Sequence, residues 1–191
     1  FPLRLRDLIA AGEIAAAAFD QRWFDVLECQ GKRSGAYSSG CYDSWPYMLL
    51  NYKGTLDGVF TLAHELGHSM HSHLANRSQG FRYADYAILV AEVASTTNEM
   101  LLTHHLLARA TDPRFRRYLL NHLCDGFKGT VYRQVQFAEF ERLLFDMAER
   151  GEPLTHEGLS ERYFEINSRY YGAGVEADRR IALEWMRIPH F

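Results

Sequence analysis

The sequence predicts a mainly α-helical domain with a small β element near residues 33–52. Apolar side chains recur every three or four positions over most of the chain, which is the spacing of amphipathic helices. Residues that favour helix starts, such as Thr and Asp, precede several of these runs. Residues 32–52 differ, because they are rich in Gly, Ser, Tyr and Pro and show no helical period. With 191 residues, the chain can form one sizeable core or two small ones.

The first part of the chain is expected to pass from helix to β structure. Residues 3–28 predict one or two amphipathic helices, whose apolar positions are Leu8, Ile14, Phe19, Trp23 and Leu27. After them we expect an extended segment or edge strand over residues 33–41 and, beyond a loop, a second short strand over residues 47–52.

The next helix carries a pattern that is typical of metal binding. Its apolar back spans residues 59–74, and Thr55 and Asp57 suit its first turn as an N-cap hydroxyl and a carboxylate. His64 and His68 are four residues apart, so they lie on one face of the helix about 6 Å apart along its axis. Both imidazoles can therefore bind one ion.

Glu65 and Gly67 lie between these two histidines. Glu65 points about 100° away around the helix axis, which lets it reach a water on the ion but makes it a poor tetrahedral ligand. We therefore expect Glu65 to act as a base, and Gly67 to remove bulk beside the ion. The alternative is a pair of helical histidines satisfied by ordinary hydrogen bonds.

A catalytic zinc site needs a third protein ligand and an open position for water. His71 lies about 10 Å along the helix axis from His64, too far to share one ion. Glu92 is a better candidate, because it lies in an apolar stretch where an unpaired carboxylate would cost several kcal/mol. From the residues alone, a buried ion pair of Glu92 with Arg82 or Arg109 remains an alternative.

Two further polar residues accompany Glu92 on a helix predicted over residues 84–110. Glu99 lies two turns beyond Glu92 on the same face, where it could accept the second ring N–H of a ligating histidine. Ser95 lies between these two glutamates on that face. We expect Ser95 and Glu99 to support the metal ligands.

Helices dominate the rest of the chain. Asp112 and Pro113 suit the start of one helix, residues 118–150 continue it, and Thr155 starts another that runs to Tyr171. A last helix is expected around Trp185. The larger apolar residues of the 118–150 stretch are expected in the core, and they are Phe127, Tyr132, Phe137, Phe140, Leu144 and Met147.

The motif His64-Glu-Leu-Gly-His68, followed by Ala91-Glu-Val-Ala-Ser-Thr-Thr-Asn-Glu99, resembles the M3 family of zinc metallopeptidases, and most closely its oligoendopeptidase F branch. The resemblance also includes residues 31–40, 50–57 and 184–191. It implies a zincin-like helical catalytic domain that binds one Zn²⁺ per chain. By this resemblance the zinc ligands are His64, His68 and Glu92, and Glu65 activates water to hydrolyse internal bonds of short oligopeptides.

The same resemblance implies that residues 1–191 are a single catalytic domain truncated at both ends. A helical part would precede residue 1, and a tyrosine-rich segment that stabilises the oxyanion would follow residue 191. Residues 33–52 would form an extended segment of the substrate cleft, since a peptide can add to a strand edge through main-chain hydrogen bonds. The candidate substrate-binding residues are Gly35, Ala36, Tyr37, Gly40 and His190.

Two other functions are compatible with the motif. An aminopeptidase-type gluzincin uses the same histidine pair and a downstream glutamate, but no Gly-x-Met-x-Asn-like segment precedes His64 to bind a free amine. A metal-stabilised helical binding module that has lost catalysis would have no use for a base at Glu65.

Composition narrows the expected partners. The net charge of −3 and the lack of a basic tract argue against nucleic acid, and no apolar run has membrane-spanning length. Three cysteines, an odd number without metal-binding spacing, suit reduced thiols and a cytoplasmic location. An oligopeptide substrate is the expected partner, and the sequence does not indicate an oligomeric state.

Overall fold

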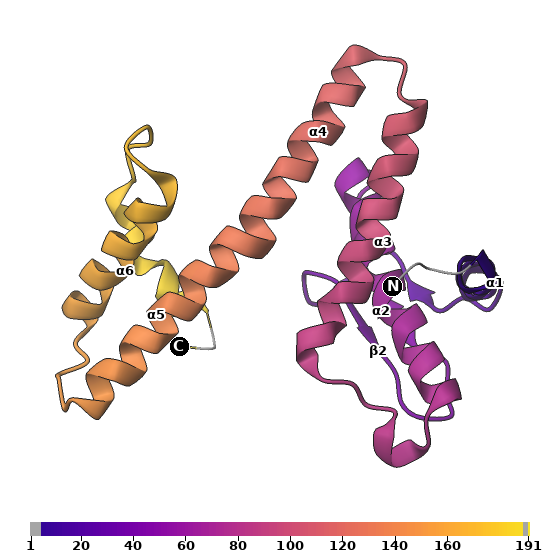
Figure 1. The fold of residues 1–191 in the computed structure, drawn as a ribbon, viewed down its shortest axis with the longest axis horizontal. Helices are drawn as coiled ribbons and strands as arrows, with labels where there is room; N and C mark the ends of the chain where they lie inside the picture. The colour runs from indigo at the N-terminus through magenta and orange to yellow at the C-terminus, as the bar shows by residue number, and fades with distance from the viewer. Residues whose placement is uncertain (1–4, 189–190) are drawn as a thin grey trace. The chain divides into compact units, whose positions relative to one another are not determined.

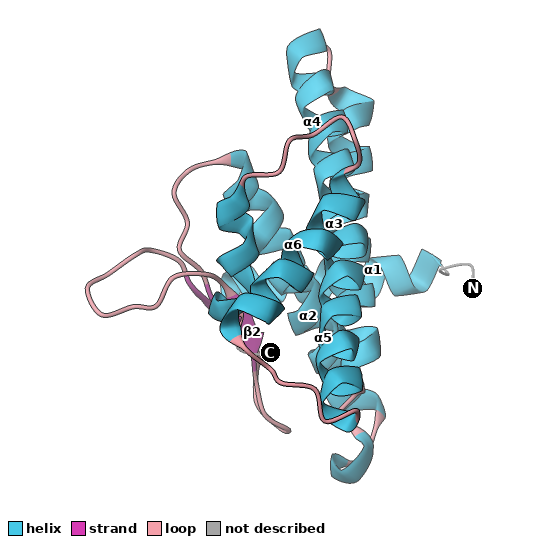
Figure 2. Ribbon diagram, turned by 90° about the vertical axis from the view of Figure 1, so that its left-hand side faces the viewer, coloured by secondary structure: helices cyan, strands magenta, loops and turns pink. Residues whose placement is uncertain are grey.

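The structure is a computed structural model that describes residues 5–188 and 191, with side chains from residue 12 onward. Figure 2 shows a mainly helical chain with a few short strands, which confirms the predicted fold class. The chain divides into two compact units, Phe1–Thr111 and Asp112–Phe191. The expectation that residues 1–191 form a single catalytic domain stays a prediction.

The first unit combines three helices with a small sheet (Figure 1). Its elements are α1 (Leu5–Asp20), β1 (Phe24–Asp25), β2 (Tyr37–Ser39), β3 (Tyr47–Leu49), α2 (Leu56–Ser78), the 3₁₀-helix η1 (Phe81–Tyr83) and α3 (Ile88–Arg109). The strand order is β1-β3-β2, in which β1 is parallel and β2 antiparallel to β3. The two predicted strands correspond to β2 and β3, and β2 lies at the edge of the sheet.

The prediction of helix through residue 28 is wrong beyond Asp20, because the chain turns at Arg22 and enters β1. Arg22 has a left-handed φ of 57°, which ends the helical path. Trp23 is only 1% exposed and packs in a core with Ile14, Ala18, Met48 and Leu66. Its carbonyl accepts a hydrogen bond of 2.8 Å from the Met48 N–H. Trp23 therefore packs against residues of α1, α2 and β3 instead of lying on the face of a continuing helix.

The N-cap at the start of α2 and its close crossing with α3 fix the position of α2. The Thr55 hydroxyl accepts a hydrogen bond of 3.1 Å from the Gly58 N–H, which confirms the predicted N-cap. Gly67 lies where α2 meets α3, and a Cβ at this position would be 2.7 Å from Ser95 Cα. The lack of a side chain at Gly67 lets the two helices approach, and the role expected for Gly67 beside the ion stays a prediction. The start of α3 is Ile88, four residues later than predicted.

The second unit contains three α-helices, a π-helical turn and a C-terminal 3₁₀-helix. Its elements are α4 (Pro113–Phe127), the π-helical turn η2 (Lys128–Tyr132), α5 (Arg133–Glu149), α6 (His156–Tyr171) and the 3₁₀-helix η3 (Arg179–Arg187). The predicted caps Asp112 and Thr155 are confirmed, since their side chains accept from the N–H groups of Arg114 and Gly158. Trp185 lies in η3, so its predicted helix is 3₁₀.

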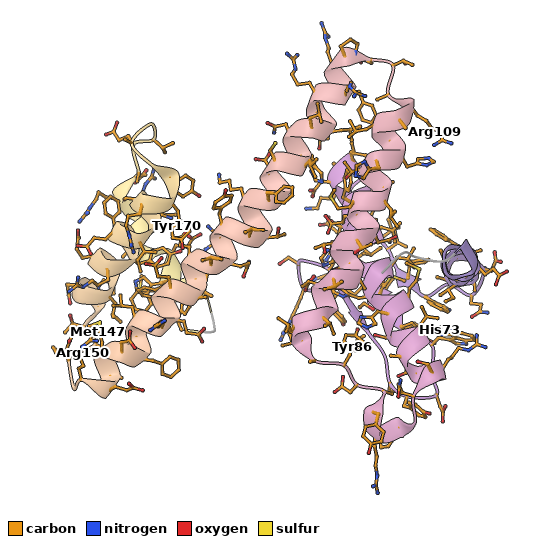
Figure 3. All side chains as sticks on the ribbon, in the orientation of Figure 1. His73, Tyr86, Arg109, Met147, Arg150 and Tyr170 are labelled. Atoms are coloured by element: carbon orange, nitrogen blue, oxygen red, sulfur yellow. The ribbon has the colours of Figure 1, made fainter. Side chains whose placement is uncertain are left out.

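The core of this unit lies between α5, α6 and η3. Phe140 and Tyr163 are fully buried there, and Met147, labelled in Figure 3, is 7% exposed. The prediction of core positions is wrong for Phe127 and Tyr132, which are 56% and 60% exposed. The π-helical turn adds a residue to the helical repeat at this point and rotates the apolar face. Within the described part of the chain, no helix combines enough length and apolar character to cross a bilayer.

Candidate metal centre

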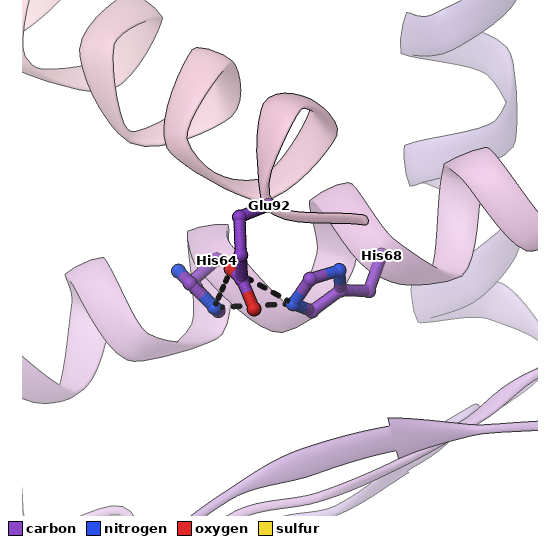
Figure 4. A group of neighbouring side chains, drawn as sticks. All are labelled: His64, His68 and Glu92. Atoms are coloured by element: carbon purple, nitrogen blue, oxygen red, sulfur yellow. Dashed lines mark hydrogen bonds and ion pairs between the residues drawn. The ribbon is translucent and has the colours of Figure 1, made fainter. Parts of the chain in front are cut away.

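Three side chains from two helices converge at the centre of the first unit (Figure 4). The Nε2 atoms of His64 and His68 are 3.1 Å apart. Glu92 Oε2 lies 3.2 Å from His64 Nε2 and 3.5 Å from His68 Nε2. Tetrahedral zinc with bonds of about 2.0–2.1 Å separates its ligand atoms by about 3.4 Å. The spacing and the nitrogen and oxygen donors therefore fit a zinc ion.

The candidate ligands come from α2 and α3. Consecutive turns of α2 carry His64 and His68, while α3 brings Glu92 from the other side of the crossing at Gly67. The Ser95 hydroxyl donates a hydrogen bond of 2.7 Å to Glu92 Oε2, which orients this carboxylate. Asn98 Nδ2 donates a hydrogen bond of 2.6 Å to the Ala63 carbonyl and ties the helices together.

The expected burial of Glu92 is wrong, because its side chain is 61% exposed. The apolar residues at the start of α3 do not enter a core: Ile88 and Leu89 are each 86% exposed. The alternative ion pair with an arginine is not formed either. Among the described residues, the ion pairs of Glu92 are with His64 and His68, and Arg109 contacts His105.

Glu99 contacts the far side of the His64 ring. Its Oε1 lies 2.5 Å from His64 Nδ1, so the ring can present Nε2 to an ion. The hydrogen bond to Glu99 outweighs desolvation and raises the pKa of His64. At His68 burial dominates and lowers the pKa, which favours the neutral ring that binds a metal.

Glu65 is the most buried of the three carboxylates at the centre. It is 7% exposed, and burial raises the pKa of its carboxyl group despite the nearby charge of His64. A backbone hydrogen bond from Ser38 in β2 acts in the opposite direction. A carboxylate with a raised pKa beside a metal position is suited to accept and return a proton.

The predicted substrate-binding residues are not all brought to the centre. Gly40 lines a cavity that also contacts His68 and Glu92, whereas Gly35, Ala36 and Tyr37 do not line it. Gly35 has a left-handed φ of 97°. His190 lies outside the described residues.

Sequence reasoning missed three residues that help to build the centre. The Ser38 hydroxyl is 2.7 Å from that of Ser69 and joins β2 to α2. Tyr86 stacks on His71 with ring centroids 3.7 Å apart, and its hydroxyl is 2.9 Å from that of Ser72. Asn98 directly precedes Glu99 in the recognised motif, but no sequence signal showed that its amide faces α2.

Comparison with known proteins identifies relatives of this chain. The model of Peptidase family M3 matches residues 7–191. Oligopeptidase PepF of Bacillus subtilis (strain 168) is 49% identical over 191 residues, covering 98% of this chain and 28% of that protein. Oligoendopeptidase F, chromosomal, of Lactococcus lactis subsp. cremoris is 53% identical over 175 residues, covering 92% and 29%. The chain thus spans less than a third of the length of these curated relatives.

Solved structures show the same relationship. A structure from Chlamydophila abortus superposes with a TM-score of 0.75 at 46% identity, covering 94% of this chain and 30% of that one. Oligoendopeptidase-F from Enterococcus faecium superposes with a TM-score of 0.56 at 52% identity, covering 71% of this chain and 24% of that one. The family model and these relatives agree, and the chain therefore belongs to peptidase family M3.

Proposed function

We propose that this chain carries the zinc centre of an endopeptidase that hydrolyses internal bonds of short oligopeptides. His64, His68 and Glu92 hold one zinc ion, and Glu65 is the general base. The observation that carries the proposal is the convergence of three donor atoms at 3.1–3.5 Å with a buried glutamate next to them in sequence. The relatives named as oligopeptidase and oligoendopeptidase support the substrate class.

In this mechanism the protein residues hold the ligands and move one proton. Zinc supplies Lewis-acid polarisation of the scissile carbonyl and activation of water. The Glu65 carboxylate takes the proton from the attacking water and delivers it to the leaving amide nitrogen. The burial of Glu65 supports the first of these transfers, because a raised pKa makes its carboxylate a better base. Glu99 holds the His64 ring, and Ser95 holds Glu92.

The edge of the sheet is proposed to bind the substrate backbone. β2 pairs with β3 on one side, so its other side can accept an extended peptide as an added strand. The hydrogen bond from the Ser38 backbone to Glu65 indicates that this strand lies beside the base. Gly35, Ala36, Tyr37, Gly40 and His190 remain proposed contacts of the peptide. The three free cysteines support a cytoplasmic location.

Metal analysis tests the zinc centre without requiring turnover. The chain is expected to hold one zinc per molecule, and a His64→Ala variant is expected to hold far less while keeping its helical content. Glu65→Gln is expected to keep the zinc, because Glu65 is not a ligand. Equal zinc content in the native chain and the His64→Ala variant would contradict the ligand assignment.

Hydrolysis of a doubly end-blocked peptide tests the catalytic proposal. Cleavage between internal residues excludes strict aminopeptidase action, since that reaction needs a free amine. Glu65→Gln is expected to slow cleavage about 10²–10⁴-fold, as removal of a general base does. A binding module without catalysis would instead show no functional change in this variant.

A further inference from the structure

A cavity beside the candidate metal centre has a distinctive lining. It has a volume of about 560 Å³, within the usual range for ligand sites, and it is bordered by His68 and Glu92. Its wall also includes Tyr42, Phe81, Asp85 and Tyr86. A group that fills this cavity would therefore lie close to a bond held at the metal centre.

The carboxylates that line this cavity give it a negative charge. Asp85 and Glu92 line it, and none of its described lining residues is a lysine or an arginine. Glu92 is engaged by His64 and His68, whereas Asp85 is exposed and makes no ion pair within the described part of the chain. Asp85 therefore has a carboxylate available for a ligand in this cavity.

The aromatic rings that line the cavity are a second feature that favours a cationic ligand. Tyr42 and Phe81 contact each other edge-on with centroids 5.5 Å apart, and the Tyr42 hydroxyl donates to the Gln79 carbonyl. Tyr86 is held in place by its stack on His71 and its contact with Ser72. A cation that lies over such rings is attracted to their faces.

We propose that this cavity is a specificity subsite that binds a lysine or arginine side chain next to the scissile bond, with Asp85 as the residue that selects it. The proposal rests on the proposed peptidase function. The aliphatic part of such a side chain packs along the aromatic wall, and its charged end reaches the carboxylate. A free N-terminal amine has the same charge, so the test separates it from a side chain.

The test measures peptide binding to the 191-residue chain loaded with zinc, in a Glu65→Gln background that prevents hydrolysis. The probes are fluorescein-labelled, end-blocked hexapeptides that differ only in one central residue, which is lysine, norleucine or glutamate. At low salt the lysine peptide is expected to bind about fivefold more tightly than the norleucine peptide.

Changes at Asp85 then identify the cause of this preference. Asp85→Asn is expected to bring the ratio of the two affinities to about one, and Asp85→Lys to favour the glutamate peptide. Asp20→Asn is the matched control, because Asp20 is an exposed carboxylate of the same unit outside the cavity, and it should keep the fivefold ratio. Both Asp85 variants change an exposed residue and should fold normally.

Several results would overturn the subsite. These are equal binding of the lysine and norleucine peptides, including no binding of either, or a preference that survives Asp85→Asn. The norleucine peptide is also measured with a free N-terminus, and tighter binding of this form than of its end-blocked form, with no preference for lysine among the end-blocked probes, would assign the carboxylate to the terminal amine instead. Zinc content, measured on the same samples, separates these results from failure of the metal centre.

Discussion

At the residue scale, the contact between Glu99 and His64 fixes a ring that is proposed to bind zinc. A carboxylate 2.5 Å from Nδ1 fixes the ring orientation and leaves Nε2 available. Loss of such a partner usually lowers metal affinity about 10–100-fold. We therefore expect Glu99→Ala to weaken zinc binding by this factor, measured by competition with a chelator, and Glu99→Gln to weaken it less because its amide oxygen still accepts.

The matched control for this prediction is Glu13→Ala. Glu13 is an exposed carboxylate of the same unit on α1, so its removal changes the net charge equally without touching a histidine. If both alanine variants bind zinc as the native chain does, Glu99 has no part in holding His64.

The sequence was sufficient to find the residues of the centre but not their environments. Helical spacing alone placed His64 and His68 on one face. The exposure of Glu92 depends on what packs on the first turns of α3, and the partners of Ser38 and Asn98 depend on contacts across 31 and 35 residues of sequence. Local spacing carries no information about such distant contacts.

At the element scale, the crossing of α2 and α3 determines whether Glu92 can meet the histidines. A Cβ at Gly67 would be 2.7 Å from Ser95 Cα and 2.8 Å from the Ala94 carbonyl oxygen, which are backbone atoms that cannot move independently. We expect Gly67→Ala to lower the free energy of unfolding by about 1–3 kcal/mol, the usual cost of overpacking. Denaturant unfolding measures this, and the zinc affinity should fall in the same variant.

A glycine in an open position provides the comparison. A Cβ at Gly12, in α1, would meet no atom within 4 Å. Gly12→Ala should therefore leave stability unchanged or raise it by up to about 1 kcal/mol through better helix propensity. Equal effects at both positions would show that the crossing at Gly67 is not tightly packed.

The boundaries of the elements were predictable where a side chain caps the backbone. Thr55, Asp112 and Thr155 accept hydrogen bonds from the first turns of their helices, which is a local interaction. The strand at Phe24 was missed, because its pairing partner Met48 lies far along the chain. The spacing of apolar residues alone does not distinguish one continuous helix from a helix that is followed by a buried strand. The pairing partner of the strand must be known first.

At the scale of the whole molecule, all proposed ligands lie within the first compact unit. His64, His68 and Glu92 precede the boundary at Thr111, and so do Ser95 and Glu99. We therefore expect a protein of residues 1–111 to bind one zinc with an affinity close to that of the 191-residue chain, measured by chelator competition. A loss of zinc binding in a helical 1–111 protein would show that the second unit contributes to the centre.

The stability of the second unit should depend on pH, because this unit contains the buried carboxylate of Glu184. Desolvation acts to raise the pKa of this group, but hydrogen bonds from Arg133, Arg187 and Tyr163 prevail and lower it. A lowered folded-state pKa means that the stabilisation is complete above the ordinary carboxyl pKa. It is lost as the pH falls through the folded-state value.

We expect Glu184→Gln to reduce the free energy of unfolding of this unit at pH 7 by about 2–3 kcal/mol, since it weakens hydrogen bonds to a charged group. As the pH falls through the folded-state pKa of Glu184, the difference between the native chain and this variant should decrease, and thermal unfolding followed by circular dichroism at several pH values measures it. Glu149→Gln, at an exposed residue of α5, is the control and should parallel the native chain. A difference that stays constant down to strongly acid pH would mean that Glu184 stabilises the unit by packing instead of by charge.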